Sequence, residues 1–144
     1  MVLLSFSVKE DELKAGTKIR TTRLYTPQKW DQWRRAVGDT PSSFGPHNLQ
    51  GWWKPRTKGG YKLFSRRGRD LYRLQFHELN GRPWPYRERD SGLFTPMTTD
   101  EFRQYLREEG FEGQLEEFLR FFEDHYAPLD GVVFQSIAFP PEVS

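Results

Sequence analysis

Cysteine is absent from this chain of 144 residues, and methionine occurs only twice. Without cysteine the chain cannot form a disulfide framework, a Cys-ligated zinc site or a thiol nucleophile. Apolar residues are scarce as well, at 35% of the chain with a mean hydropathy of −0.83. The opening MVLLSFSVKEDE has no basic segment or cleavage site, and no apolar run reaches the roughly 18 residues of a membrane span. We therefore expect a cytoplasmic protein with no membrane segment.

Aromatic residues compensate for the shortage of aliphatic ones. They make up 16% of the chain, as 12 Phe, 6 Tyr and 5 Trp. Each buried aromatic side chain removes roughly 150–250 Å² from water, so a core can be built from few large groups. The length suits one hydrophobic core, and we expect a single, monomeric domain over residues 1–144.

Charge is distributed unevenly along the chain. Residues 14–89 hold 18 Lys or Arg against 5 Asp or Glu, whereas residues 90–144 hold 3 against 12. Such asymmetry indicates a basic face that attracts phosphate groups, with acidic helices elsewhere. The alternative is that the two halves neutralise each other across the fold.

Local patterns predict a mixture of strands and helices. Alternating or β-branched residues indicate strands near 4–8, 17–23, 49–54, 61–64, 72–76 and 132–139. Caps and helical spacing indicate helices over 9–15, 27–37 and 99–109, and a fourth with its apolar stripe at 115–122. By composition, residues 38–48 and 80–97 are long loops. The order predicts an α+β domain whose small mixed sheet curls into a barrel.

One short segment combines cations, hydroxyls and a glycine. Residues 16–23 read Gly-Thr-Lys-Ile-Arg-Thr-Thr-Arg, a composition that can hold an anion or a polar carbonyl at a turn before a strand. The pattern Gly16-x-Lys18-x-x-Thr21-x-Arg23 resembles the signature of the ASCH superfamily, PUA-like β-barrel domains related to RNA-binding modules. The resemblance extends to residues 52–57, to residues 109–111 between two late helices, and to the closing strand.

The resemblance implies both an activity and a set of residues. Some ASCH proteins are amidohydrolases that deacetylate N(4)-acetylcytidine with a lysine, a threonine and a glutamate, and others have been proposed to be ribonucleases. The matching residues here are Lys18, Thr21 and Glu109, with Glu108 and Glu112 as the alternatives for the glutamate.

Amide hydrolysis requires a nucleophile, a base and an acid for the leaving amine. In our hypothesis Thr21 is the nucleophile, Lys18 takes its proton and Glu109 protonates the departing nitrogen. Residues 18 and 21 point to opposite faces of a regular strand, so this mechanism needs a turn or bulge within residues 16–21.

Further residues are candidates for binding a nucleoside or RNA, including tRNA. Aromatic and cationic side chains together suit nucleobases and phosphates. These candidates are Gly16, Arg20, Arg23, Trp53, Lys54, Arg56, Arg66 and Arg67. The three histidines lack metal-ligand spacing, so we expect no metal and no cofactor.

Three hypotheses about function follow. The leading one is a hydrolase that acts on N(4)-acetylcytidine-type substrates. The second is a non-catalytic RNA-binding module that uses the same basic pocket, and the third is a ribonuclease.

Overall fold

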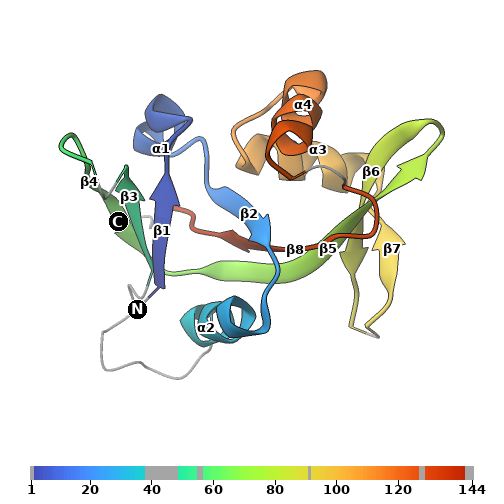
Figure 1. Cartoon of the computed structure of the whole chain (residues 1–144), viewed down its shortest axis with the longest axis horizontal. Coiled ribbons are helices and arrows are strands. Elements are labelled where there is room, and N and C mark those ends of the chain that lie inside the picture. Colours follow the sequence, from blue (N-terminus) through green and yellow to red (C-terminus); the bar gives the residue numbers. More distant parts are fainter. Residues whose placement is uncertain (1, 38–48, 55–56, 91, 127–128, 142–144) are drawn as a thin grey trace.

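A computed structural model describes residues 2–37, 49–54, 57–90, 92–126 and 129–141. This part of the chain holds eight strands and four helices and is an α+β fold (Figure 1). In chain order the elements are β1 (Val2–Phe6), α1 (Glu10–Ala15), β2 (Arg20–Leu24), α2 (Pro27–Val37), β3 (Leu49–Trp53), β4 (Tyr61–Arg66), β5 (Arg69–Leu79), β6 (Arg82–Glu88), β7 (Phe94–Pro96), α3 (Thr99–Glu108), α4 (Leu115–Tyr126) and β8 (Val133–Ala138).

The described strands form two open sheets rather than the closed barrel that we expected. One sheet has the order β1-β3-β4 and the other β2-β8-β5-β6-β7, and only β1 and β3 pair in parallel. Gly68 lies where the chain passes from β4 into β5, and a Cβ there would approach Ile137 Cδ1 to 2.7 Å. Helices lie on both sides of the larger sheet (Figure 1), and they bury most of β8 and alternate residues of β5 without the sheet closing into a barrel.

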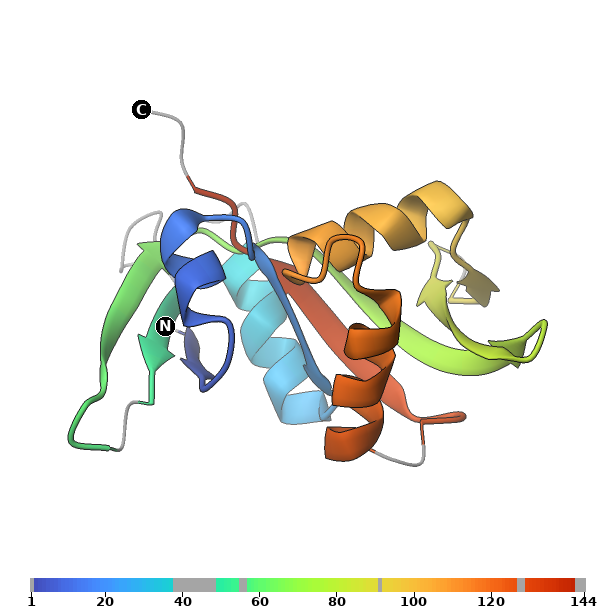
Figure 2. The ribbon, with the colours of Figure 1, turned by 90° about the horizontal axis from the view of Figure 1, so that it is seen from above.

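Two hydrophobic cores lie against these sheets. Seen from above in Figure 2, α3 and α4 cover the larger sheet, whereas α1 lies beside the smaller one. The first core is an aromatic cluster in which Phe76 of β5 packs 5.4 Å from Phe122 of α4 and 5.8 Å from Phe134 of β8, measured between ring centroids. The second core joins β1, α1, α2 and β3. Large aromatic groups therefore compensate for the low aliphatic content, as predicted.

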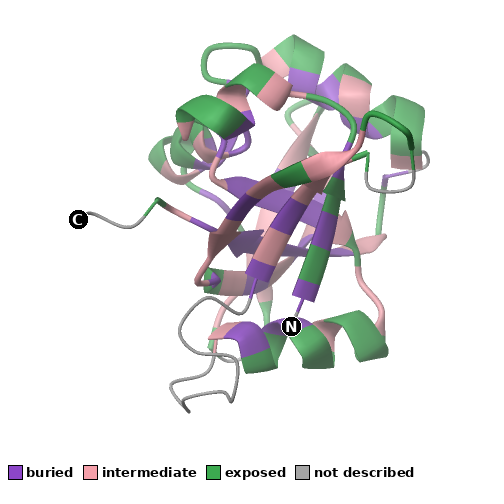
Figure 3. Ribbon diagram, turned by 90° about the vertical axis from the view of Figure 1, so that its left-hand side faces the viewer, coloured by how far each residue is buried: buried purple, intermediate pink, exposed green. Residues whose placement is uncertain are grey.

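The predicted local elements are confirmed in most places. Burial alternates along β1, as Figure 3 shows for the strand beside the N-terminus, but the strand ends at Phe6, so Val8 of the predicted strand lies beyond it and is exposed. Gly16 ends α1 with a φ of 77°, a left-handed conformation that glycine adopts without strain. The capping box between Thr98 and Glu101 is present at the start of α3. Residues 38–48, predicted to be a loop, lie outside the described residues.

The prediction of a long loop over residues 80–97 is wrong, because this segment contains β6 and β7. Asn80 and Gly81 both have positive φ, 54° and 82°, and form the tight turn between β5 and β6. The carbonyl of Pro85 accepts from Met97 N at 2.9 Å, so the backbone polar groups of residue 85 face away from β5. Pro83 is two residues away and faces the same side. The missing proline N–H groups therefore remove no hydrogen bond from the β5–β6 ladder.

None of the described helices combines the length and the apolar character that crossing a bilayer requires.

Arg89 and Glu101 form an ion pair at the start of α3. This pair predicts a contribution to the free energy of unfolding that is lost in acid. Hydrogen bonds from Arg89 and from the capping box lower the pKa of Glu101 to about 2. Because this pKa is lower in the folded chain than in the unfolded one, the contribution is complete above about pH 4.5 and is lost toward pH 2. Glu101→Gln is therefore expected to cost about 1 kcal/mol at pH 6, given that the side chain is a third exposed.

Thermal unfolding of the wild type and Glu101→Gln from pH 2 to 6 tests this expectation. The difference in Tm should be roughly 2–4 °C at pH 6 and should shrink as pH falls. The exposed Glu78→Gln is the matched control. A difference in Tm that is the same at pH 2 and pH 6 would contradict the role given to the ionised carboxylate.

Candidate functional site

Most of the buried polar side chains in the described residues gather where β2, β8 and the end of α3 meet. We call this group the polar cluster; its members are Lys18, Arg20, Thr22, Tyr105, Glu109 and Ser136. The chain enters the cluster after Gly16 ends α1, and the backbone N–H groups of Thr17 and Lys18 both donate to Glu12 O at 3.0 Å. This local turn places Lys18 before the first residue of β2.

Lys18 is held by three acceptors. Its Nζ lies 2.8 Å from Arg20 O, 2.9 Å from Glu109 O and 3.0 Å from Glu109 Oε2. Burial lowers the pKa of Lys18, and the charge of Glu109 opposes this shift. Three acceptors match the three N–H groups of an ammonium, whereas a neutral amine has only two. The geometry therefore suits Lys18 as a cation that orients Glu109, rather than as a base.

The carboxylate of Glu109 bridges Lys18 and a threonine. Its Oε1 accepts from Thr22 Oγ1 at 2.5 Å, while its Oε2 faces the ammonium. Thr22 Oγ1 also lies 2.6 Å from Tyr105 Oη and 3.1 Å from Ser136 Oγ. Burial raises the pKa of Tyr105, so its phenol keeps the proton that it donates to Thr22. A hydroxyl bonded to a carboxylate that is itself oriented by a third group is the arrangement of an activated nucleophile.

Thr21, the threonine of the sequence signature, lies on the opposite face of β2. Its Oγ1 accepts from Arg23 Nε at 3.1 Å, and Arg23 also donates to Ser5 O at 2.7 Å. The structure thus brings Lys18 and Glu109 together, as the hypothesis requires, but places Thr22 rather than Thr21 against Glu109. Strand alternation is the signal in the sequence that could have identified Thr22, because Arg20 and Thr22 must share a face.

Arg20 is a buried member of the polar cluster and connects it to residues of β5 and α3. It is 1% exposed, and its guanidinium donates to Ser136 Oγ at 3.0 Å and to Asp70 Oδ2 at 2.5 Å. The guanidinium carbon also lies 4.7 Å from the centroid of the Tyr72 ring. Glu108 Oε1 lies 3.5 Å from Arg20 Nε. Asp70 and Ser136 were not singled out from the sequence, because each lies far along the chain from Arg20. Glu108 was an alternative for the site glutamate, but its contact with Arg20 was not predicted.

One cavity borders the polar cluster, and a second is lined by residues next to the cluster in sequence. The first, which we call the Arg20 cavity, has a volume of about 320 Å³ and is lined by Arg20, Tyr72, Arg87, Tyr105 and Glu108 among others. The second has a volume of about 520 Å³; Glu108 lines both cavities, and Gly16 and Gly110 also line the second. Both volumes fall within the range of about 300–1,000 Å³ that is usual for small-molecule sites.

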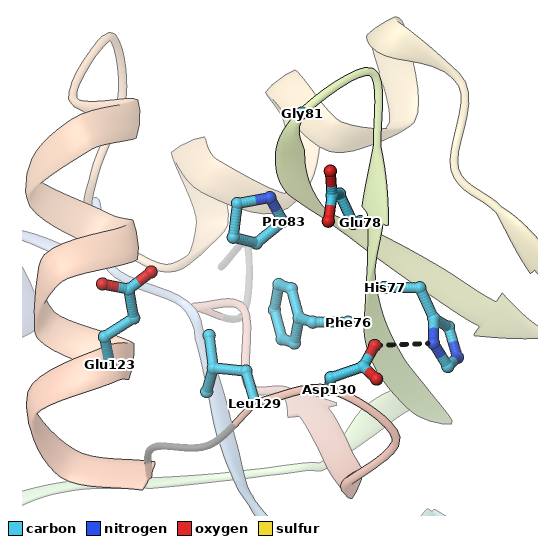
Figure 4. A pocket seen from close by; sticks show the side chains of 8 residues that line it. All are labelled: Phe76, His77, Glu78, Gly81, Pro83, Glu123, Leu129 and Asp130. Carbon is cyan, nitrogen blue, oxygen red and sulfur yellow. Dashed lines mark hydrogen bonds and ion pairs between the residues drawn. The ribbon is translucent and has the colours of Figure 1, made fainter.

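A larger cavity of about 820 Å³ lies between the β5–β6 hairpin and α4 (Figure 4). Around the ring of Phe76 it carries Glu78, Glu123 and Asp130, and the carboxylate of Asp130 lies 3.3 Å from His77 Nδ1. Its described lining has no hydroxyl, amine or guanidinium group. The lining pairs His77 with Asp130 but places no hydroxyl against a carboxylate, whereas the polar cluster holds the Thr22 hydroxyl against Glu109, so the chemistry favours the polar cluster.

The remaining predicted binding residues lie apart from the cluster. Trp53 and Lys54 are at the end of β3, where Lys54 Nζ lies 5.3 Å from the Trp53 ring. Arg66 of β4 donates to Phe139 O at 3.0 Å and lies over the Phe64 ring, so its guanidinium serves the fold. Arg67 is half-buried between β4 and β5. Arg56 lies outside the described residues.

Within the described ranges, no three His, Asp or Glu side chains are grouped so that they could hold a metal ion. Comparison of the chain with protein-family models, curated proteins and solved structures gave no match.

The buried ion pair makes a prediction about stability. Lys18→Met leaves the Glu109 carboxylate buried without its cation and is expected to lower the free energy of unfolding by about 3–5 kcal/mol. Lys14→Met removes an exposed pair with Glu10 and is expected to change the free energy of unfolding far less than Lys18→Met does. Urea unfolding measures both.

A double-mutant cycle distinguishes coupling from general damage to the core. The double variant Lys18→Met/Glu109→Leu should be less destabilised than the sum of the two single variants, because neither charge is left alone. Additive losses would contradict a direct interaction between the two side chains.

Proposed function

We propose that this protein hydrolyses an acyl amide on a nucleoside, of the N(4)-acetylcytidine type, with Thr22 as the nucleophile. The observation that carries the proposal is the Glu109 carboxylate, which contacts the Lys18 ammonium through one oxygen and the Thr22 hydroxyl through the other. The resemblance of residues 16–23 to the ASCH signature supports the same reaction class. The assignment of the nucleophile departs from that signature.

In the proposed first step, Thr22 Oγ1 attacks the acyl carbon while its proton passes to Glu109. The C–N bond then breaks, and the amine leaves with the proton from Glu109, so that an acyl ester remains on Thr22. Water attacks this ester with Glu109 again taking the proton, and the carboxylic acid is released as the Thr22 hydroxyl is restored. Lys18 donates to Glu109 Oε2 and so orients the Glu109 side chain toward Thr22 before each proton transfer.

Tyr105 separates Thr22 from the Arg20 cavity. The Tyr105 side chain lines the cavity, and its hydroxyl contacts Thr22 Oγ1 at 2.6 Å. Thr22, the proposed nucleophile, is therefore hydrogen-bonded to a residue that lines the cavity but is not itself part of the lining. In the proposed reaction the Tyr105 hydroxyl gives up this contact when the acyl group approaches.

The charge of the Arg20 cavity favours an uncharged substrate. Its lining has four carboxylates, those of Asp70, Asp100, Glu101 and Glu108, against the guanidinium groups of Arg20 and Arg87. A phosphate would meet repulsion from these carboxylates, whereas an acylated nucleoside carries no charge at neutral pH. This lining supports nucleoside amide hydrolysis over ribonuclease activity in this cavity.

Paired variants of the adjacent threonines test the proposal. With N(4)-acetylcytidine as substrate, Thr22→Val is expected to lower kcat/KM at least about 100-fold, because the nucleophile is lost. Glu109→Gln is expected to lower kcat/KM by about 10²–10⁴-fold through loss of the general base. Cytidine release, followed by chromatography, measures each rate.

Thr21→Val is the matched variant, since Thr21 is equally buried on the neighbouring position of β2. An activity retained in Thr21→Val and lost in Thr22→Val supports the proposed nucleophile. The reverse result would return the role to the signature threonine. Absence of cytidine release by the wild type would overturn the proposed reaction on this substrate.

A second candidate function is RNA binding by the β3–β4 hairpin. Lys54, Lys58 and Lys62 are exposed there, and Lys54 lies over the Trp53 ring. Cations beside an aromatic ring suit single-stranded RNA. This surface is separate from the Arg20 cavity, so the two functions can be tested independently.

Salt dependence tests the hairpin surface. If these lysines contact phosphates, Lys58→Ala/Lys62→Ala should weaken binding of a single-stranded RNA and flatten the dependence of log K on log salt by about 0.7 per lost contact. Lys29→Ala, on an exposed position of α2, is the control. Equal affinities and equal slopes in all three proteins would exclude RNA binding by this hairpin.

A further inference from the structure

One buried donor at the Arg20 cavity has no hydrogen-bond acceptor. Arg20 is 1% exposed; Nη1 and Nη2 bond to Ser136 and Asp70, but Nε makes no hydrogen bond. Glu108 Oε1 lies 3.5 Å from Nε, which gives electrostatic attraction without a hydrogen bond. Buried donors are almost always paired in folded proteins, so an unpaired one at a cavity wall is suited to an acceptor from a ligand.

Glu108 places an acceptor beside this donor. Its side chain is 12% exposed and borders both the Arg20 cavity and the adjoining cavity. The ring of Tyr72 and the buried Met97 supply apolar surface in the same lining. Arg20 and Arg87 flank the Tyr72 ring at 4.7 and 4.1 Å from its centroid, which fixes the ring and the Arg20 guanidinium together.

A donor next to an acceptor complements one edge of cytosine. Cytosine presents an acceptor at ring N3 next to a donor at N4–H, and N4-acylation retains one N4–H. Uracil presents the reverse order, with a donor at N3 and an acceptor at O4. Against Arg20 and Glu108, the uracil edge would therefore set donor against donor and acceptor against carboxylate.

We propose that the Arg20 cavity recognises a cytosine-type base, with N3 accepting from Arg20 Nε and N4–H donating to Glu108. On binding, the Glu108 carboxylate moves from its ion pair with Nε to the ligand N–H. The inference rests on the proposed function, for which it names the residues that select the base. Ser136 connects the base site to the nucleophile, because its Oγ lies 3.0 Å from Arg20 Nη1 and 3.1 Å from Thr22 Oγ1.

Calorimetric titration of the full chain with cytidine and with uridine tests the inference without requiring turnover. The wild type is expected to bind cytidine at least about tenfold more tightly than uridine, because two hydrogen bonds to charged groups are exchanged for repulsive contacts. Arg20→Lys should reduce this preference by about tenfold or more, since lysine has no Nε–H at that position. Glu108→Gln should also narrow the preference, because its amide can donate to uracil O4.

Arg103→Lys and Glu117→Gln are matched controls at exposed positions and should keep the preference. Circular dichroism establishes that each variant is folded, and Glu108→Gln provides the test if Arg20→Lys does not fold. Equal affinity of the wild type for both nucleosides, or no binding of either, would overturn the inference even if N(4)-acetylcytidine were hydrolysed. A cytidine preference that depends on Arg20 and Glu108 supports the inference, even if no hydrolysis occurs and the proposed reaction fails.

Discussion

The buried ion pair between Lys18 and Glu109 is the constraint on which the candidate site depends. Both side chains are nearly inaccessible to water, so each charge is stable only while the other remains in place. The pair joins the start of β2 to the end of α3, and the backbone adds a bond from Ile19 N to Glu108 O at 2.7 Å. The positive φ of Gly110 ends the helix directly above Lys18, where a Cβ would lie 3.2 Å from that of the lysine. The end of α3 and the start of β2 are therefore joined by the ion pair, a backbone hydrogen bond and close packing of Gly110 on Lys18.

The alternation of β2 divides its side chains between two environments. Arg20 and Thr22 face α3, where a hydroxyl, a guanidinium and a carboxylate lie within one hydrogen-bonded network. Thr21 and Arg23 face the other side, toward β1 and Phe6. Because adjacent strand residues cannot share a face, the same short segment supplies a polar network to one side of the sheet and an anchor for β1 to the other.

The aromatic core gives this polar network its rigid support. Tyr105 packs against Phe118 at 5.6 Å between ring centroids, while its hydroxyl contacts Thr22. An aromatic ring with a polar end can thus belong to the hydrophobic core and to the site at once. Covering both faces of the larger sheet with helices buries the network from water, which strengthens its electrostatic interactions.

The sequence alone determined those features that depend on near neighbours. The Gly16 helix end, the Thr98 capping box and the alternation in β1 and β5 each involve residues a few positions apart, and the structure has them as predicted. Lys18 and Glu109 lie 91 positions apart, and the prediction that they share a site came from the resemblance to the ASCH signature rather than from a local pattern. The tertiary structure alone decided that residues 80–97 contain β6 and β7, that Glu109 meets the face of β2 that carries Thr22, and that Arg20 is buried beside Glu108. These outcomes depend on strand register and on which face meets α3, and both are set by packing between segments distant in the chain.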